Sequence, residues 1–254
     1  MDKLSDRQNS ILQLVEAQGF VATERLVEAL GVTPQTIRRD INQLCDLNLL
    51  QRFHGGAGRS ATSENQPYSA RREAASVGKE RIARMVAKAI PDGASLFLNI
   101  GTTTEAVAEA LLTKKSLTIV TNNLNVASTL ARNESFEISI AGGLLRTKDS
   151  GIVGHSATEF MNRFRLDYGI IGVSGIETDG SLLDFDERET QTARAIIKNS
   201  SQTFLVADHT KFGRRAMIRF ADLSEIDTVF TDEQPSSEFI SLCKHANVEL
   251  QVGK

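Results

Sequence analysis

The sequence has no long hydrophobic run and few cysteines, and each of these absences excludes a class of protein. None of the apolar stretches in its 254 residues reaches the ~18 residues that cross a membrane. The N-terminus, MDKLSDRQNS, contains acidic residues and no apolar segment of the kind that a secretory signal requires. The two cysteines, Cys45 and Cys243, form no CxxC motif, which indicates a reducing compartment without structural disulfides. We therefore expect a cytoplasmic protein that has no membrane partner.

An excess of basic charge, the simplest sign of a nucleic-acid partner, is also absent. The net charge is −3, and the first sixty residues contain seven basic and seven acidic side chains. Support for DNA binding must therefore come from the positions of the arginines rather than from their number. The hydrophobic content of 41% and the charged content of 24% are ordinary for a globular protein with a core of normal size.

Metal-ligand spacing and the motifs of nucleophilic catalysis are missing as well. No such spacing connects the four histidines, which are His54, His155, His209 and His245, so we expect no structural metal. The serines Ser174 and Ser181 lack the context of a nucleophile elbow, and the chain has no GxxxxGK phosphate loop. We therefore expect no catalytic residues and no cofactor.

The first sixty residues predict three helices followed by a hairpin. An apolar stripe predicts a helix over residues 5–19, and Thr23 is expected to cap a second helix that ends at Gly31. In the third helix Thr33 is the N-cap, and Pro34 takes the first position, where its missing N–H costs nothing.

The third helix is expected to bury one face and to present polar side chains on the other. Ile37, Ile41 and Leu44 repeat at spacings of four and three residues and form the apolar face. The exposed N-terminal half carries side chains that bond base edges and phosphates in the major groove. The stretch LLQRFHGGAG then predicts two extended pieces around a glycine turn, a wing that reaches the backbone or the minor groove. These patterns predict contacts to double-stranded operator DNA from Thr33, Gln35, Thr36, Arg38, Arg39, Asn42, Arg52 and His54.

A three-helix module that binds another protein, with solvated arginines, is the alternative interpretation. The short spacing between the helices, the Thr-Pro start and the glycine-rich hairpin favour DNA binding. Asp40 falls near the buried edge of the third helix. We expect it to orient Arg38 or Arg39, or to bond a backbone N–H.

A stretch of small and polar residues divides the chain into two folded parts. The segment GRSATSENQP has no large apolar side chain and predicts a linker. We place a winged helix-turn-helix domain at residues 1–57, the linker at 58–78 and a ligand-sensing domain at 79–254.

From Pro91 onward, apolar strands alternate with amphipathic helices. Strands are expected at 94–100, 117–121, 136–142, 168–173, 203–207 and 228–231, and helices at 103–113, 124–132, 156–163, 188–200 and 236–245. This alternation predicts an α/β domain with a mostly parallel sheet that is covered on both faces.

The loops after the expected strands carry residues that suit an anion. Gly101 permits a sharp turn, and residues 102–104 present hydroxyls and N–H groups at a helix N-terminus, although a plain N-cap is the alternative interpretation. Lys211 lies in a glycine-flanked loop, either as a phosphate partner or as an exposed lysine. Because ligands bind at the carboxyl ends of the strands in open parallel sheets, we expect these loops to converge there.

The predicted site for a small phosphorylated metabolite takes residues from the ends of several strands. Asp179 and Gly180 also fit a simple turn. The acidic residues near 184–189 include helix N-terminal charges, which is the preferred interpretation of Glu187 and Glu189. The predicted ligand-binding residues are Gly101, Thr102, Thr103, Thr104, Asn122, Asn123, Gly142, Gly143, Asp179, Gly180 and Lys211.

Motifs along the whole chain resemble those of the DeoR family of repressors. They are R-x3-I-x3-V from Arg7, TPQTIRRDI at 33–41, R-x-H-G-G at 52–56, GTT at 101–103, TNN at 121–123, AGG at 141–143, DG at 179–180 and DHxKFG at 208–213. The resemblance implies a winged helix-turn-helix joined to an effector domain similar in fold to ribose-5-phosphate isomerase.

The stretches 119–127, 164–176 and 208–217 most resemble the branch of this family that controls glycerol-3-phosphate metabolism. This resemblance implies repression that glycerol 3-phosphate releases, and a homo-oligomer, either a dimer or a tetramer. Family members commonly carry Asp before the GTT turn, whereas this chain has Asn99. The missing charge favours phosphate and weakens any argument for acid–base chemistry there.

A ligand-controlled repressor without catalysis is the favoured function. A sugar-phosphate isomerase with an accessory module is the alternative from another class, but isomerisation needs a base near a C–H and an acid near the carbonyl. No convincing pair stands out in the sequence. A regulator of another sugar-phosphate pathway and a DNA-binding activator also remain open.

Overall fold

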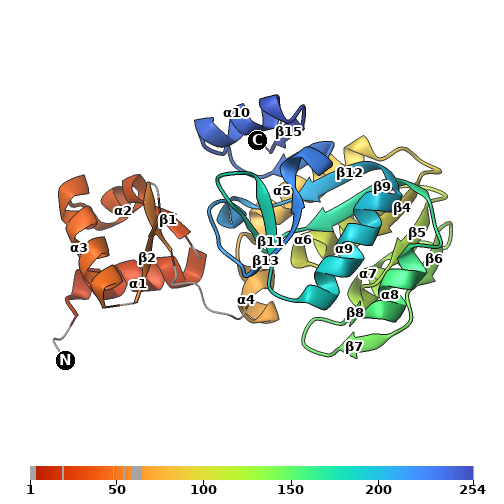
Figure 1. Ribbon diagram of the computed structural model, residues 1–254, viewed down its shortest axis with the longest axis horizontal. Helices are drawn as coiled ribbons and strands as arrows, with labels where there is room; N and C mark the ends of the chain where they lie inside the picture. The colour runs from red at the N-terminus through yellow and green to blue at the C-terminus, as the bar shows by residue number, and fades with distance from the viewer. Residues whose placement is uncertain (1–3, 19, 48, 54, 59–64, 254) are drawn as a thin grey trace.

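The computed structural model describes residues 4–18, 20–47, 49–53, 55–58 and 65–253 of the chain. Figure 1 shows a small N-terminal body of helices and short strands and a larger body built around a sheet. Among the described residues, no helix combines the length and the apolar character that a membrane crossing requires.

The N-terminal body is a winged helix-turn-helix. Its elements are α1 (Asp6–Gln18), β1 (Phe20–Ala22), α2 (Thr23–Leu30), α3 (Pro34–Asp46), β2 (Gln51–Phe53) and β3 (Gly56–Gly58). The strands form an antiparallel sheet with β3 in the centre, and β2 and β3 make the wing. Ile37, Ile41 and Leu44 are buried in one core with Ile11 of α1, which confirms the predicted apolar face of α3.

Local signals set the ends of these helices as predicted, with one exception. The hydroxyl of Thr33 accepts the N–H of Thr36 at 3.3 Å, and Gly31 ends α2 with a φ of 64°. The prediction that Thr23 caps α2 was wrong, because Thr23 is the first residue of the helix. Its N–H donates to the carbonyl oxygen of Gly55 at 2.7 Å. The hairpin therefore helps to fix the start of α2, and the local sequence does not show this contact.

The range interpreted as a linker, 58–78, contains helical structure. Helix α4 spans Tyr68–Glu73, and α5 spans Ser76–Ala89. Ala75, between them, has a φ of 53° and turns the chain sharply from one helix into the next. The boundaries that we drew at 57 and 79 stay a prediction.

The larger body is built on a parallel sheet of seven strands in the order β15-β14-β12-β9-β4-β5-β6. These strands are β4 (Ser95–Leu98), β5 (Thr118–Thr121), β6 (Glu137–Ile140), β9 (Leu166–Gly172), β12 (Ser200–Val206), β14 (Thr228–Thr231) and β15 (Glu249–Val252). Its further helices are α6 (Thr102–Leu111), α7 (Leu124–Leu130), α8 (His155–Met161), α9 (Glu187–Asn199) and α10 (Ser237–His245). The α/β class and the parallel sheet are confirmed, and β15 is a strand that the sequence analysis missed.

Alternate residues along a central strand enter two separate cores. On β4, Leu96 and Leu98 belong to one core together with Ile82 of α5. Phe97 points the other way, into a core that contains Ile196 of α9. Because both faces of the sheet bury apolar side chains, the sequences of the strands are continuous hydrophobic runs.

The connections that follow β6, β9 and β12 carry short additional elements. They are β7 (Leu144–Arg146) and β8 (Gly151–Val153), then β10 (Gly175–Ile176) and β11 (Ser181–Asp184), then the 3₁₀ turns η1 (His209–Lys211) and η2 (Leu223–Glu225) with β13 (Ile218–Asp222) between them. Strands β10, β11 and β13 form a small antiparallel sheet. These insertions bring polar residues to the carboxyl ends of the parallel strands.

Candidate nucleic-acid interface and ligand pocket

The polar face of α3 is open to solvent. Gln35, Arg38, Arg39 and Asn42 are exposed, as is Thr33 before the helix. Their exposed side chains form the kind of surface that a recognition helix offers to a major groove.

The remaining predicted DNA contacts flank this surface. The hydroxyls of Thr33 and Thr36 lie 2.9 Å apart, so Thr36 helps to fix the start of α3. Arg52 of the wing donates from Nη1 to Asn42 Oδ1 at 3.2 Å, and this bond holds the wing beside α3. His54 lies outside the described residues.

Asp40 is structural, but its partner is not the one predicted. It is 4% exposed, and it pairs with Arg7 of α1 rather than with Arg38 or Arg39. Arg7 Nε lies 2.5 Å from Asp40 Oδ2, and Nη2 lies 3.2 Å from Oδ1. This two-pronged pair fastens α3 to α1 and leaves the arginines of α3 free to meet a partner.

A small, open cavity lies at the carboxyl ends of β4 and β9. This is the edge where open parallel sheets bind ligands. Its lining residues come from α4 and from the segments that follow β4, β9 and β12, and they are Arg71, Ile100, Gly101, Thr102, Thr103, Gly172, Val173, Ser174, Asp184, Glu189, Lys211 and Arg214.

The turn between β4 and α6 forms one wall of the cavity. Gly101 has a φ of 151°, which favours glycine, and it offers no side chain to cap α6. The hydroxyl of Thr104 turns inward to the carbonyl oxygens of Asn99 and Gly101. Asn99 is buried and accepts the N–H of Ile100 at 2.8 Å, so its side chain supports the turn. The first N–H groups of α6 therefore face the cavity, as an anion site requires.

Three cationic side chains surround the same cavity. Lys211 lies 3.9 Å from Asp208 Oδ2, and burial lowers its pKa to about 8. Arg214 donates from Nη2 to Asn65 Oδ1 at 2.9 Å. Arg71 of α4 lies 3.3 Å from Asp149 Oδ2. Together with the N-terminus of α6, they make the cavity attractive to an anion.

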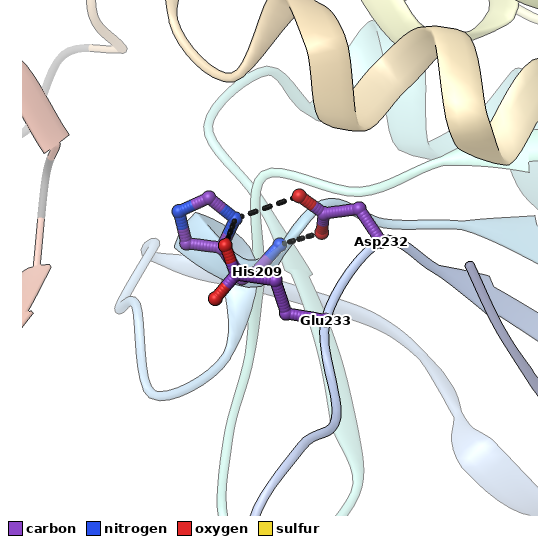
Figure 2. Close-up of side chains that lie close together, drawn as sticks. All are labelled: His209, Asp232 and Glu233. Atoms are coloured by element: carbon purple, nitrogen blue, oxygen red, sulfur yellow. Dashed lines mark hydrogen bonds and ion pairs between the residues drawn. The ribbon is translucent and has the colours of Figure 1, made fainter. Parts of the chain in front are cut away.

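A histidine–aspartate pair holds the turn that carries Lys211 (Figure 2). Asp232 Oδ1 accepts the backbone N–H of His209 at 2.7 Å, and Oδ2 lies 2.8 Å from His209 Nδ1. This hydrogen bond from Asp232 raises the pKa of His209. Glu233 adds a third donor atom, and the three side chains lie close enough to share a cation. Because the bonds to Asp232 already use Nδ1 and both carboxylate oxygens, we interpret the cluster as a support for η1.

Two carboxylates line the same cavity. Asp184 Oδ1 accepts the hydroxyl of Ser174 at 3.0 Å, and Glu189 Oε2 accepts Arg146 Nη2 at 2.6 Å. Burial, with the nearby charge of Asp184, raises the pKa of Glu189 to about 7. Asp186, by contrast, is the N-cap of α9 and accepts the N–H of Arg188, as a helix N-terminal charge should.

The structure brings only part of the predicted ligand set to this cavity. Gly101, Thr102, Thr103 and Lys211 line it. The other predicted residues are absent from this lining, and they are Thr104, Asn122, Asn123, Gly142, Gly143, Asp179 and Gly180.

Hydrogen bonds and packing account for several of these other residues. Asn122 donates to the carbonyl oxygen of Ile152, and Asn123 caps α7. Asp179 accepts the N–H of Ser181 in a turn, which is the alternative that the sequence analysis kept open. A side chain at Gly180 would meet Leu242 of α10.

Sequence analysis missed the cavity residues Arg71, Asp184, Glu189 and Arg214. One signal could have identified Glu189: it lies three and four residues before the buried Thr192 and Ala193, so it shares their face of α9. For Arg71 no such signal exists, because it falls in a range that composition assigns to a linker.

Comparisons with known proteins cover both parts of the chain. Residues 7–63 match the DeoR-like helix-turn-helix domain, and residues 74–233 match the DeoR C terminal sensor domain. The chain is 50% identical to the glycerol-3-phosphate regulon repressor of Escherichia coli (strain K12), over 98% of this chain and 99% of that protein. It is 54% identical to the repressor of the same name from Haemophilus influenzae, over 92% and 91% of the two chains.

A more distant relative and a solved structure complete the comparison. The HTH-type transcriptional repressor CsqR of Escherichia coli is 38% identical over 96% of this chain and 94% of its own. Ribose 5 phosphate isomerase A from Neisseria gonorrhoeae is similar with a TM-score of 0.40 at 17% identity, over 54% of this chain and 53% of that one.

Proposed function

The chain belongs to the DeoR family of transcriptional repressors, and we propose that it binds operator DNA through α3 and the wing until a phosphorylated metabolite fills the cavity. One observation carries this proposal: the N-terminus of α6, Lys211, Arg214 and Arg71 converge on a single cavity. A phosphate monoester is dianionic near neutral pH, and it suits a helix N-terminus flanked by cations. The proposed DNA contacts are Thr33, Gln35, Thr36, Arg38, Arg39, Asn42, Arg52 and His54.

Glycerol 3-phosphate is the effector that we propose. The support is the name of the most similar relatives described above, which are repressors of a glycerol-3-phosphate regulon. The cavity adds physical support, because its cations suit one phosphate. We also propose a dimer or a tetramer, since an operator with two half-sites requires two linked modules.

The position of α4 supports a coupling between the cavity and DNA. Tyr68 donates to Glu105 Oε2 of α6 at 2.7 Å. Lys79, which is 3% exposed, donates from Nζ to the carbonyl oxygens of Arg71 and Ala74 at the end of α4. A ligand that rearranges Arg71 therefore acts on a helix that directly follows the DNA-binding module. A hundredfold difference in affinity between two states provides about 2.7 kcal/mol of coupling.

Catalysis is the second candidate, because the cavity contains Glu189 and Lys211, whose pKa values are displaced toward neutrality. We propose that both groups bind rather than react. Glu189 is held by Arg146, and Lys211 faces Asp208. An assay for isomerisation of sugar phosphates by the purified chain separates the two functions, because turnover would establish an enzyme.

The direct test is release of operator DNA. Fluorescence anisotropy with a labelled operator should show release as glycerol 3-phosphate is added at fixed salt. The variant Lys211→Ala should still bind operator but resist release, because it loses a charge-assisted contact of ~1.5–3 kcal/mol. Binding of operator that no phosphorylated three- to six-carbon metabolite alters would contradict the proposed function.

A further inference from the structure

A buried carboxylate, that of Asp184, and a half-buried one, that of Glu189, share the cavity with the cations, and binding of a phosphate gives them no role. Asp184 ends β11 and is 8% exposed, and Glu189 lies on the first turn of α9. Both side chains line the cavity together with Lys211 and Arg71. A site for phosphate alone would gain nothing from negative charge here, since the carboxylates oppose the anion.

Each carboxylate has one oxygen that is already bonded and one that is not. Asp184 Oδ1 accepts Ser174 Oγ at 3.0 Å and the N–H of Phe185 at 2.6 Å. Glu189 Oε2 accepts Arg146 at 2.6 Å. In the described part of the chain, no hydrogen bond reaches Asp184 Oδ2 or Glu189 Oε1. Neither oxygen is among the fully buried, unpaired side-chain atoms of the described residues, and both residues line the cavity, so the two oxygens can accept donors from a ligand.

Hydrogen bonds hold the carboxylates of Asp184 and Glu189 in place without a ligand. Arg146 is 11% exposed, and its guanidinium bonds Asp149 and Asp186 as well as Glu189, at distances of 2.6–2.8 Å. The Ser174 hydroxyl and the Phe185 N–H fix Asp184 in the same way. Acceptors that are already in place recognise a donor at little entropic cost.

We propose that Asp184 and Glu189 accept hydrogen bonds from hydroxyl groups of the effector, so that the cavity selects a phosphate ester of a polyol. This inference rests on the proposed function and adds which side chains of the cavity recognise each part of the ligand. The phosphate binds at the N-terminus of α6 with Lys211 and Arg71, and the hydroxyls point toward β11 and α9. A second phosphate or a carboxylate beside Asp184 and Glu189 is rejected, because its negative charge meets two carboxylates.

The shifted pKa values agree with this geometry. Burial raises the pKa of Asp184, and burial with the charge of Asp184 raises the pKa of Glu189 to about 7. Both shifts arise from burial in the cavity, where a hydroxyl donor would stabilise the charged carboxylates.

The test compares two phosphates of equal charge. Glycerol 3-phosphate and n-propyl phosphate have the same carbon chain, but the second has no hydroxyl. Calorimetry on the full chain should show that glycerol 3-phosphate binds at least about tenfold more tightly. In Asp184→Ala and Glu189→Gln this ratio should fall several-fold, while the affinity for n-propyl phosphate stays the same or rises. Glu187→Gln is the matched control, because Glu187 is exposed on the same turn of α9 and should leave the ratio unchanged.

The outcomes separate this inference from the function on which it rests. Equal binding of the two phosphates by the unaltered chain overturns hydroxyl recognition, although the chain remains a phosphate-responsive repressor. An equal change in Glu187→Gln overturns it too, because the effect is then one of net charge. If neither phosphate binds, and operator release is absent with both, the proposed function and this inference fail together. Retained operator binding shows that each variant is folded.

Discussion

Replacement of Arg71 by glutamine should separate effector binding from stability. Arg71 makes one 3.3 Å contact with Asp149, whereas Arg146 makes two contacts of 2.8 Å with the same carboxylate. Asp149 therefore stays paired in Arg71→Gln, and the free energy of unfolding should change by less than ~1 kcal/mol. The lost interaction with a phosphate is larger, since a charge-assisted hydrogen bond contributes ~1.5–3 kcal/mol.

The loss converts into a large change in effector affinity. At about 1.4 kcal/mol per tenfold change, the dissociation constant for glycerol 3-phosphate should rise about 10- to 150-fold. Calorimetry measures this constant, and urea denaturation measures the stability. Arg72→Gln is the matched control, because Arg72 is exposed on the same helix and carries the same charge.

The same variant tests the coupling. Operator affinity is measured without effector and at effector concentrations that saturate the variant. If Arg71 transmits occupancy to α4, saturated Arg71→Gln should release operator less than the unaltered chain does. Unchanged effector affinity in Arg71→Gln, or equal weakening in Arg72→Gln, would refute the assignment of Arg71 as a ligand contact.

Three further predictions test other parts of the molecule. Arg38→Ala and Arg39→Ala should each weaken operator binding. Loss of a base contact should cost ~1–3 kcal/mol and relax sequence specificity, whereas loss of a phosphate contact should lower affinity equally for all sequences and reduce the salt dependence. Normal operator binding by both variants would contradict the recognition surface. Effector affinity should fall as pH rises above about 8, because Lys211 loses its charge there and an anion favours the charged form, whereas Lys211→Arg should remove this dependence. Asp232→Asn should weaken effector binding several-fold, because it loosens the turn at His209, while operator binding without effector stays normal. Unchanged effector affinity in calorimetry would show that the His209–Asp232 pair has no positioning role.

The sequence predicts those features that depend on neighbouring residues. Thr33 caps α3 because its hydroxyl reaches an N–H three positions on, and the apolar runs become strands because both faces of the sheet are covered. Gly101 and Lys211 could be predicted for the cavity because strand ends of a parallel sheet meet at one edge. Thr23 shows the limit of this approach, since its N–H is fixed by the distant Gly55.

The acidic and cationic side chains that the prediction missed depend on contacts across the fold. Asp184 and Glu189 come from β11 and α9. In the sequence, acids at these positions are explained as well by a helix N-terminus as by a ligand site. Whether such an acid faces solvent or a cavity depends on which element covers it. Arg71 is the extreme case, because its short helix lies in a polar stretch and is positioned by contacts with residues such as Lys79 and Glu105.

This position of Arg71 explains how a ligand far from DNA can alter DNA binding. An effector shifts an equilibrium only if it binds two states with different affinity. Of the described residues that line the cavity, Arg71 alone precedes the sheet in the chain. The other lining residues belong to the sheet and to the elements packed on it. In the proposed coupling, α4 shifts with the DNA-binding module, and the energy of the contact between Arg71 and a phosphate depends on where α4 lies. That dependence is the difference in affinity on which release of operator relies.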